Sequence, residues 1–126
     1  MLTGLDHLQI EAPPGHEAAA RAFYSDFLGL NELEKPAVLQ PNGGVWFALP
    51  DRQQLHTGVV QDFSPRRKGH PCFRCTDLNA VLARAKVFGI KVLEDVQLAP
   101  LRRVFLYDPF GNRVEIVEGG HISVLV

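Results

Sequence analysis

Hydrophobic and polar positions along the chain predict two successive series of elements, each with one helix and several strands. In the first series, alternation or short apolar runs predict strands at 5–11, 30–34, 45–49 and 54–60. Apolar residues at helical spacing predict a helix at 16–28, which Gly29 is placed to end. Pro13 to Gly15 break the chain before this helix, and the stretch from Pro36 to Pro41 is expected to be a loop.

The same order of elements recurs in the second half. A strand is predicted at 70–75, and Asp77 is a predicted N-cap for a helix that ends at Phe88. Further strands are predicted at 90–93, 103–107 and 113–118. This repetition indicates two like halves, each with a helix on one sheet face. We therefore expect an α+β fold in a single domain, made of module 1 (1–60), a basic linker (61–69), module 2 (70–118) and a tail (119–126).

Size and composition favour an ordinary globular domain. The chain has 126 residues, of which 46% are hydrophobic and 21% charged, so it can form a core without disulfides or metal. The net charge of −1 argues against a protein that coats nucleic acid or an anionic membrane, because both require a cationic surface. No apolar run approaches the ~20 residues of a membrane span, and the first ten residues do not resemble a secretory signal. We expect a cytoplasmic protein.

Cys72 and Cys75 form a C-x-x-C sequence, which can indicate redox chemistry or a zinc site. They fall in a predicted strand, where residues three apart point to opposite faces. The sequence contains no second pair of cysteines. We therefore expect no shared metal here, with one thiol in the core and the other nearer a pocket.

Alternation in the first and last strands of each half separates an apolar face from a polar face. The apolar faces can pack against the two helices. The opposite faces carry three of the five histidines and one carboxylate: His7, His56, His70 and Glu115. Each half thus offers one histidine from its first strand and one donor from its last strand.

Neutral imidazole and carboxylate groups are the ligands of Zn, Ni, Fe(II) or Mn in nitrogen and oxygen sites. An octahedral ion with four protein ligands keeps two positions for water or for oxygens of a substrate, and it can act as a Lewis acid. A purely structural metal is disfavoured, because structural zinc sites are usually closed and rich in cysteine. The pattern therefore predicts a divalent metal site with room for a reactant.

Four segments resemble the vicinal oxygen chelate superfamily, also called the glyoxalase/bleomycin resistance/dioxygenase family. These segments are LDHLQI, FYSDFLGL, GHPCFRCTDLNA and DPFGNRVEIVE, and together they span nearly the whole chain. The last is the most specific, since an Asp-Pro-x-Gly-Asn turn leading into a strand glutamate is typical of the family. The resemblance implies two βαβββ modules whose curved mixed sheets enclose a cup. Because modules pair between chains in many short members, it also implies a homodimer.

The resemblance assigns positions to the metal ligands. His7 falls at the family's first ligand position, His70 at the second-module histidine and Glu115 at the last-strand carboxylate. His56 falls at the remaining position, where glyoxalase I-like enzymes usually have Glu and methylmalonyl-CoA epimerase-like enzymes have Gln. This difference argues against glyoxalase I activity. Fosfomycin-resistance-like and extradiol-dioxygenase-like members use a His-His-Glu set, the latter usually in much longer chains.

Other side chains on the same faces are candidates for substrate binding. Arg103 shares a strand face with Phe105 and Tyr107, and Trp46 lies in the matching strand of the first half. Arg103 could bind an anionic group and the aromatic rings could pack a flat substrate. The alternative is a surface arginine with ordinary core aromatics. The remaining histidines, His16 and His121, are expected on the surface.

Two functions are compatible with these observations. The first is a metal-dependent enzyme that activates a chelated small molecule, by isomerase, lyase or ring-opening chemistry, with Glu115 or a bound water handling the proton. The second is a metal-free protein that sequesters small molecules, as bleomycin-resistance members do. Retention of all four donor positions favours the enzyme, while the substrate, the reaction and the metal stay open.

Overall fold

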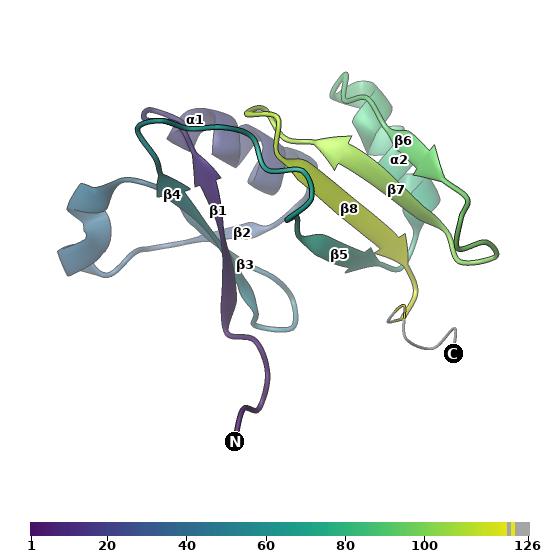
Figure 1. Cartoon of the computed structure of the whole chain (residues 1–126), viewed down its shortest axis with the longest axis horizontal. Helices are drawn as coiled ribbons and strands as arrows, with labels where there is room; N and C mark the ends of the chain where they lie inside the picture. The colour runs from purple at the N-terminus through teal and green to yellow at the C-terminus, as the bar shows by residue number, and fades with distance from the viewer. Residues whose placement is uncertain (121, 123–126) are drawn as a thin grey trace. The chain divides into compact units, whose positions relative to one another are not determined.

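The computed structural model describes residues 1–120 and 122, and the chain divides into two compact units, Met1–Pro65 and Arg66–Val126 (Figure 1). Each unit contains one four-stranded mixed sheet and helical segments. The expected α+β fold of two tandem βαβββ modules is confirmed. His121 and residues 123–126 of the predicted tail lie outside the described residues.

The sheet of the first unit has the strand order β1-β4-β3-β2. Its two inner strands are β4 (Gln54–Val59) and β3 (Trp46–Ala48), which pair antiparallel. The outer strand β1 (His7–Ala12) runs parallel to β4, and β2 (Asn31–Leu33) runs antiparallel to β3. The parallel pairing of β1 with β4 sets their polar residues side by side, because it aligns Gln9 with His56.

The helix expected at 16–28 is present as two consecutive segments, α1 (Glu17–Ala20) and η1 (Arg21–Phe27), the second of which is a π-helix. Phe23, Tyr24 and Phe27 on the π-helix are buried. The ring of Tyr24 lies 5.8 Å from that of Phe47 on β3. The apolar face of the first sheet therefore packs on this helix, as the periodicity predicted.

The segment expected as a loop between Pro36 and Pro41 is instead a 3₁₀-helix, η2 (Ala37–Asn42). Pro36 stands at its start, where its carbonyl accepts a hydrogen bond from the amide of Leu39 at 2.9 Å. Short 3₁₀ turns use bonds between residues three apart, so they form in segments too short for an α-helix. The sequence analysis predicted a loop here because prolines are typical of loops.

The sheet of the second unit has the order β5-β8-β7-β6. Its strands are β5 (Cys72–Cys75), β6 (Leu93–Asp95), β7 (Arg103–Tyr107) and β8 (Arg113–Glu118), and its helix is α2 (Leu78–Val87). β5 runs parallel to β8, and the other pairs are antiparallel. Asp77 caps α2 as predicted, because its carboxylate accepts the Ala80 amide at 3.2 Å.

One strand of the second unit differs from its prediction. A strand was expected at 90–93, but β6 begins only at Leu93. The amide of Ile90 instead donates to the carbonyl of Ala85 at 2.8 Å, next to Gly89 with a φ of +68°. Ile90 therefore belongs to the end of helix α2, where positive φ at glycine allows the chain to turn.

The Asp-Pro-Phe-Gly-Asn turn between β7 and β8 is held by buried side chains. The Asp108 carboxylate accepts the amides of Phe110 and Asn112, each at 2.9 Å. The Asn112 side-chain oxygen accepts the amide of Arg66 at 2.8 Å. The turn thus fixes the β7–β8 hairpin and also binds part of the segment predicted as a linker.

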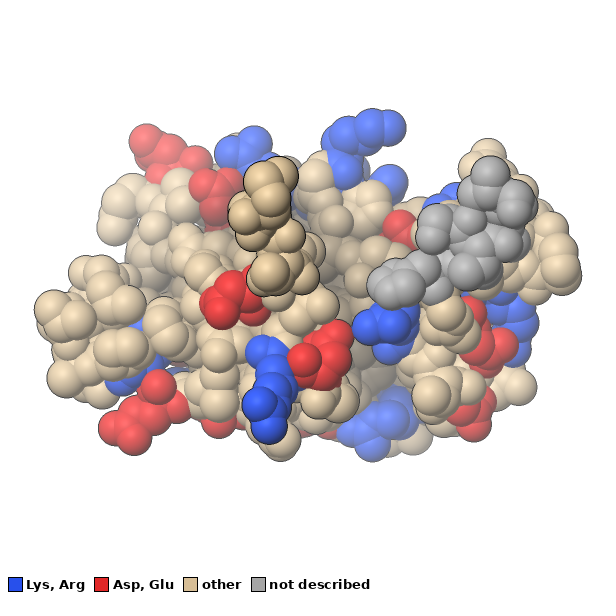
Figure 2. Space-filling model, turned by 90° about the horizontal axis from the view of Figure 1, so that it is seen from below, with Lys and Arg blue, Asp and Glu red and all other residues tan. Residues whose placement is uncertain are grey.

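Acidic and basic side chains are interspersed on the face drawn in Figure 2, with no large area of one sign. This distribution agrees with the balance of charged residues in the sequence. Among the described residues, no helix is both long and apolar enough to span a bilayer.

Candidate functional site

The strand pairing makes the polar faces of the two units directly comparable. In the first unit Trp46 pairs with His56, and in the second unit Phe105 pairs with Glu115. On the outer parallel strands, Gln9 is aligned with His56 and Cys72 is aligned with Glu115. His56 and Glu115 therefore occupy equivalent positions. His7 and His70, two residues before Gln9 and Cys72, are equivalent in the same way.

In the second unit the structure brings two predicted metal ligands together. The Nε2 atom of His70 lies 2.9 Å from Oε1 of Glu115, which is only 5% exposed. The Nδ1 atom of His70 lies 2.9 Å from the carbonyl oxygen of Lys68, so Nδ1 must carry the proton of the neutral ring. The lone pair of Nε2 then faces a carboxylate oxygen. These two acceptors repel each other unless a proton or a metal ion lies between them.

Arg103 lies on the other side of the Glu115 carboxylate. Its guanidinium contacts Oε2 of Glu115 at 3.2 Å and the carboxylate of Asp95 at 3.2 Å. Burial disfavours the charged form of Arg103, but the hydrogen bonds to Glu115 and Asp95 outweigh it and raise the pKa. Arg103 therefore stays charged and holds one oxygen of Glu115, while the other oxygen faces His70.

Two of the aromatic residues predicted to bind substrate have distinct surroundings. The Phe105 ring lies 5.8 Å from that of His70 in an edge-on arrangement. The guanidinium groups of Arg103 and Arg113 lie 5.2 and 5.0 Å from its centre. Tyr107 instead lies beneath the guanidinium of Arg67, at 5.6 Å. Phe105 thus belongs to the His70–Glu115 cluster, whereas Tyr107 contacts the segment before β5.

In the first unit, three rings form a stack on the sheet. The rings of His7 and His56 lie 4.2 Å apart, and those of His56 and Trp46 lie 3.9 Å apart and nearly parallel, at 1°. His56 is buried, and desolvation lowers its pKa, with the neighbouring His7 adding to the effect. His56 is therefore neutral at pH 7, which is the state in which imidazole binds metals.

Each histidine of this stack has one ring nitrogen committed to an oxygen. Nδ1 of His7 donates to the carboxylate of Asp6 at 2.9 Å, and Nε2 of His56 donates to the amide oxygen of Gln54 at 2.8 Å. The opposite ring nitrogen of each has no partner among residues 1–120 and 122. Metal-binding histidines characteristically donate their second N–H to an oxygen in this way. The sequence analysis did not identify Asp6 and Gln54 as hydrogen-bond partners. Their only sequence signal is their position next to His7 and two residues before His56.

The predicted ligands are imidazole and carboxylate groups, which bind divalent metals, and a hydrogen bond to an oxygen holds each of the three histidines. The 2.9 Å between His70 and Glu115 is close to the ~3 Å between adjacent ligands at right angles around an ion with ~2.1 Å bonds. Within each unit, however, the described residues bring together two predicted donors. No group of three or more His, Cys, Asp or Glu side chains in the described part of the chain could hold a metal ion.

The cysteines are both free, as expected, but neither lies in the core. Cys72 is exposed and Cys75 is half-buried, because β5 is an edge strand with a neighbour on one side only. Although Cys72 keeps exposed surface, its thiol lies against Glu115. Desolvation and this carboxylate raise the pKa of Cys72 to about 12. Cys72 is therefore a neutral thiol at pH 7 and a poor nucleophile.

The expectation that His16 lies on the surface is wrong. His16 is 2% exposed, with Nδ1 2.8 Å from the carbonyl of Pro13 and Nε2 2.6 Å from the hydroxyl of Thr57. The turn after β1 places the ring against β4, where it connects the helix start to the sheet. His121, also expected on the surface, lies outside the described residues.

Comparison with known proteins assigns a family to this arrangement. A family model described as the glyoxalase/bleomycin resistance protein/dioxygenase superfamily matches residues 4–116. The chain belongs to this superfamily. Among curated proteins, lactoylglutathione lyase of Pseudomonas aeruginosa is 36% identical over 73 residues. The match covers 58% of this chain but only 40% of that protein, so the chain corresponds to less than half of this relative.

Solved structures of the superfamily share the fold over nearly the whole chain. A glyoxalase family protein from Bacillus anthracis has a TM-score of 0.91 and 38% identity, covering 95% of this chain and 98% of its own. Lactoylglutathione lyase from Agrobacterium tumefaciens has a TM-score of 0.75 and 24% identity, covering 94% and 95%. The second likeness concerns the fold alone.

Proposed function

We propose that this superfamily member is a metal-dependent enzyme acting on a small oxygen-bearing molecule. Its metal ligands are His7, His56, His70 and Glu115, supplied by one chain or by the two chains of a cytoplasmic homodimer. The reaction is of isomerase, lyase or ring-opening type. Similarity to a lactoylglutathione lyase supports lyase chemistry, whereas His56 at a position that is usually Glu in glyoxalase I-like enzymes argues against the same reaction.

One observation carries this proposal. All three histidines have one nitrogen bonded to an oxygen acceptor, namely Asp6, Gln54 or the Lys68 carbonyl. Each therefore keeps one lone pair available in its neutral state, and that of His70 faces Glu115. A set of histidines placed only for packing would not need this common arrangement of donors.

The residues around Glu115 support a role in proton transfer. A bound divalent ion supplies Lewis acidity that stabilises negative charge developing on a substrate oxygen. Arg103 holds Oε2 of Glu115, so Oε1 is the oxygen that remains to contact a bound ion or to exchange a proton. Glu115 is thus the proposed catalytic residue, and Arg103 is a positioning residue.

Metal content tests this proposal directly. The full chain purified without chelator is expected to contain about one divalent ion per chain, measured by inductively coupled plasma mass spectrometry. His70→Ala and Glu115→Gln should each lower metal affinity by at least about 100-fold, because a lost ligand costs more than the 10–100-fold typical of a lost supporting group. Glu94→Gln is the matched control, since Glu94 is exposed on β6.

Folding must be checked before the variants are interpreted. Circular dichroism should show the same secondary structure for the variants and the control. If the folded wild-type protein takes up none of Zn, Ni, Mn or Fe(II), or if both ligand variants bind metal as the wild type does, the enzyme proposal is wrong.

The stacked rings favour a second candidate function. His7 and Trp46 are the outer rings of the stack and present flat surfaces of the kind that bind planar molecules, so the protein could sequester a drug without metal. This function requires tight binding of a planar compound by chelator-treated protein. A chain that binds stoichiometric metal and needs it for ligand uptake contradicts the sequestration function.

A further inference from the structure

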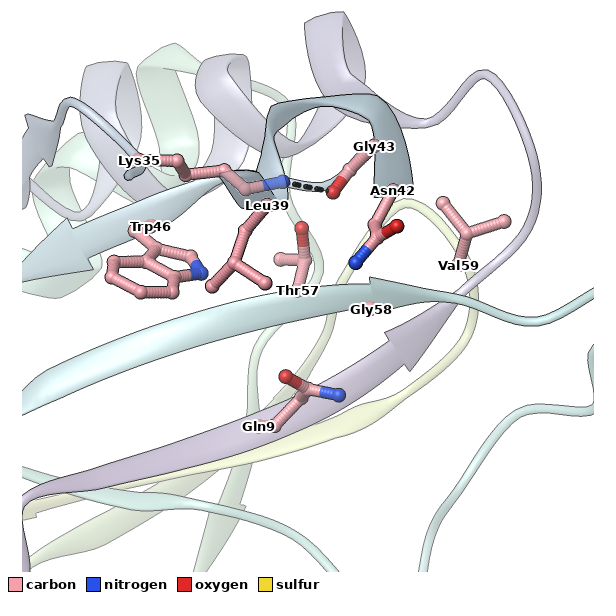
Figure 3. A pocket seen from close by; sticks show the side chains of 9 residues that line it. All are labelled: Gln9, Lys35, Leu39, Asn42, Gly43, Trp46, Thr57, Gly58 and Val59. Carbon is pink, nitrogen blue, oxygen red and sulfur yellow. Dashed lines mark hydrogen bonds between the residues drawn. The ribbon is translucent and has the colours of Figure 1, made fainter. Parts of the chain in front are cut away.

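We propose that a cavity in the first unit binds the carboxylate group of a small apolar or aromatic acid. The cavity has a volume of about 260 Å³ and lies between η2 and the sheet (Figure 3). Its lining includes Lys35, Trp46, Gln9, Asn42 and Leu39. This inference rests on the proposed function, because it names the substrate class of the same polar face, and it is tested separately below.

Lys35 provides the positive charge of this cavity. Its ammonium group donates to the carbonyl of Gly43, as Figure 3 shows, and it forms no ion pair with a carboxylate among the described residues. Lys35 is only half-exposed. An ammonium group has three N–H donors, so donors remain for a ligand. A partly buried cation without an acidic partner favours an anion in the space beside it.

Further donors line the same space. The side-chain amides of Gln9 and Asn42 and the indole N–H of Trp46 have no hydrogen-bond partner in the described part of the chain. In Figure 3 the indole nitrogen of Trp46 is on the side of the ring that faces Leu39. Several neutral donors around one cation match the acceptor oxygens of a carboxylate.

The charges nearby favour a monoanion over a phosphate. Lys35 is the lining residue that carries a positive charge. The Glu17 carboxylate lies close to the cavity, where Oε2 accepts the Gly44 amide at 2.8 Å. The amide of Gly43 donates to the Gln40 carbonyl at 3.2 Å, so these glycine amides are not free to surround a phosphate. A second negative charge would therefore be left without a partner and would face Glu17.

The apolar walls indicate the rest of the ligand. Leu39 and Val59 line the cavity together with one edge of Trp46, and the Trp46 ring also stacks on His56 at 3.9 Å. A ligand whose carboxylate contacts Lys35 would thus extend along an aromatic surface toward a proposed metal ligand. The substrate class assigned is a small organic acid with an apolar or aromatic body.

Trp46 allows a direct test, because it is the only tryptophan in the sequence and its fluorescence reports on this cavity. Phenylacetate is titrated into the full chain in the presence of EDTA, so that binding does not depend on metal. We expect a saturable change in fluorescence with phenylacetate, and none over the same range with the neutral analogue phenylacetamide. Lys35→Met should weaken phenylacetate binding by at least about tenfold, the effect of losing one charge-assisted hydrogen bond.

Two variants make the result specific. Lys35→Arg keeps the charge and should bind within about threefold of the wild type, because the guanidinium also binds carboxylates. Lys91→Met, an exposed position in the second unit, should bind like the wild type. Circular dichroism checks that each variant is folded.

Several outcomes would overturn the inference. These are no saturable binding of phenylacetate to the wild type, equal binding to Lys35→Met, equal binding of phenylacetamide, or tighter binding of phenyl phosphate. Binding that occurs only when metal is present would assign the anion to the metal instead of the cavity. If the chain binds phenylacetate in EDTA but takes up no metal, the cavity inference holds and the proposed enzyme function fails.

Discussion

His56 in the first unit and Glu115 in the second occupy equivalent places in two similar sheets, yet their surroundings differ. His56 lies in a stack with His7 and Trp46, next to the neutral amide of Gln54. Glu115 lies in an ionic cluster that contains Arg103, Asp95 and His70. The strand register thus places a donor in both units, while the neighbouring side chains give the two donors different partners.

The two units also differ at the neighbouring positions of these sheets. Gly44 precedes Trp46 by two residues, just as Arg103 precedes Phe105 by two residues. Lys35 follows Leu33 by two residues, as Asp95 follows Leu93, and these leucines pair with Trp46 and Phe105. Where the second unit has an arginine paired with an aspartate, the first unit has a glycine and, beside a cavity, a lysine that pairs with no carboxylate of the described residues. The same scaffold therefore supports a filled ionic site and an open one.

The largest effect on this comparison is expected from Arg103→Met. This change leaves the carboxylates of Glu115 and Asp95 without their cation, and both are largely buried. The free energy of unfolding should fall by about 3 kcal/mol, as when one partner of a buried ion pair is removed. Urea denaturation of metal-free protein measures this value. Arg102→Met is the control, since the Arg102 side chain contacts the neutral Asn79 and pairs with no carboxylate among residues 1–120 and 122. Similar losses in both variants would show that the ionic cluster has no special role.

A smaller effect is expected from Gly44→Ala, which adds a side chain at the equivalent position of the first unit. The new Cβ would lie 2.1 Å from the carbonyl oxygen of Thr57, and the φ angle of +88° is unfavourable for alanine. We expect a loss of about 2 kcal/mol in the free energy of unfolding. Gly29→Ala has a similar φ of +80° but no atom within 4 Å of its Cβ, so it isolates the cost of the backbone angle. Equal losses in both variants would contradict the clash.

The smallest effect is expected from Glu17→Gln. The hydrogen bond from the Gly44 amide lowers the pKa of Glu17, so folding favours its ionised form. The variant should lose about 1 kcal/mol of unfolding free energy at pH 7, the scale of one hydrogen bond.

The pH dependence gives the sign of this contribution. The stabilisation by Glu17 is fully present above its unfolded pKa, about 4.3, and is lost as the pH falls through the lower folded pKa. Denaturation curves between pH 7 and pH 3 should therefore show the variant approaching the wild type at low pH. A difference that stays constant over this range would exclude the carboxylate charge as its cause.

The sequence predicted most of the strands and their two faces, because alternation of residues such as Val114 and Ile116 with Arg113 and Glu115 directly reflects the two faces of a sheet. The sequence prediction was wrong where local backbone hydrogen bonds determine the conformation. Short 3₁₀ bonds after Pro36 form a helix in a proline-rich segment, and the end of α2 takes up Ile90.

The site was less predictable than the fold. Periodicity identifies the face of His7, His56, His70 and Glu115, but it cannot show which partners each side chain will meet. The Arg103–Glu115 pair and the surroundings of Lys35 depend on the register in which β7 pairs with β8 and β2 with β3, which the alternation pattern does not determine. The burial of His16 depends on a turn that bends its ring onto Thr57.

The proposed function requires that His7, His56, His70 and Glu115, supplied by one chain or by two, bind one divalent ion. X-ray absorption at the zinc edge, recorded on the full chain loaded with one equivalent of zinc, tests this claim most directly. The account predicts nitrogen and oxygen neighbours only, with imidazole scattering that decreases in His7→Ala, His56→Ala and His70→Ala alike. Sulfur neighbours from the cysteines, or spectra unchanged in these variants, would contradict it.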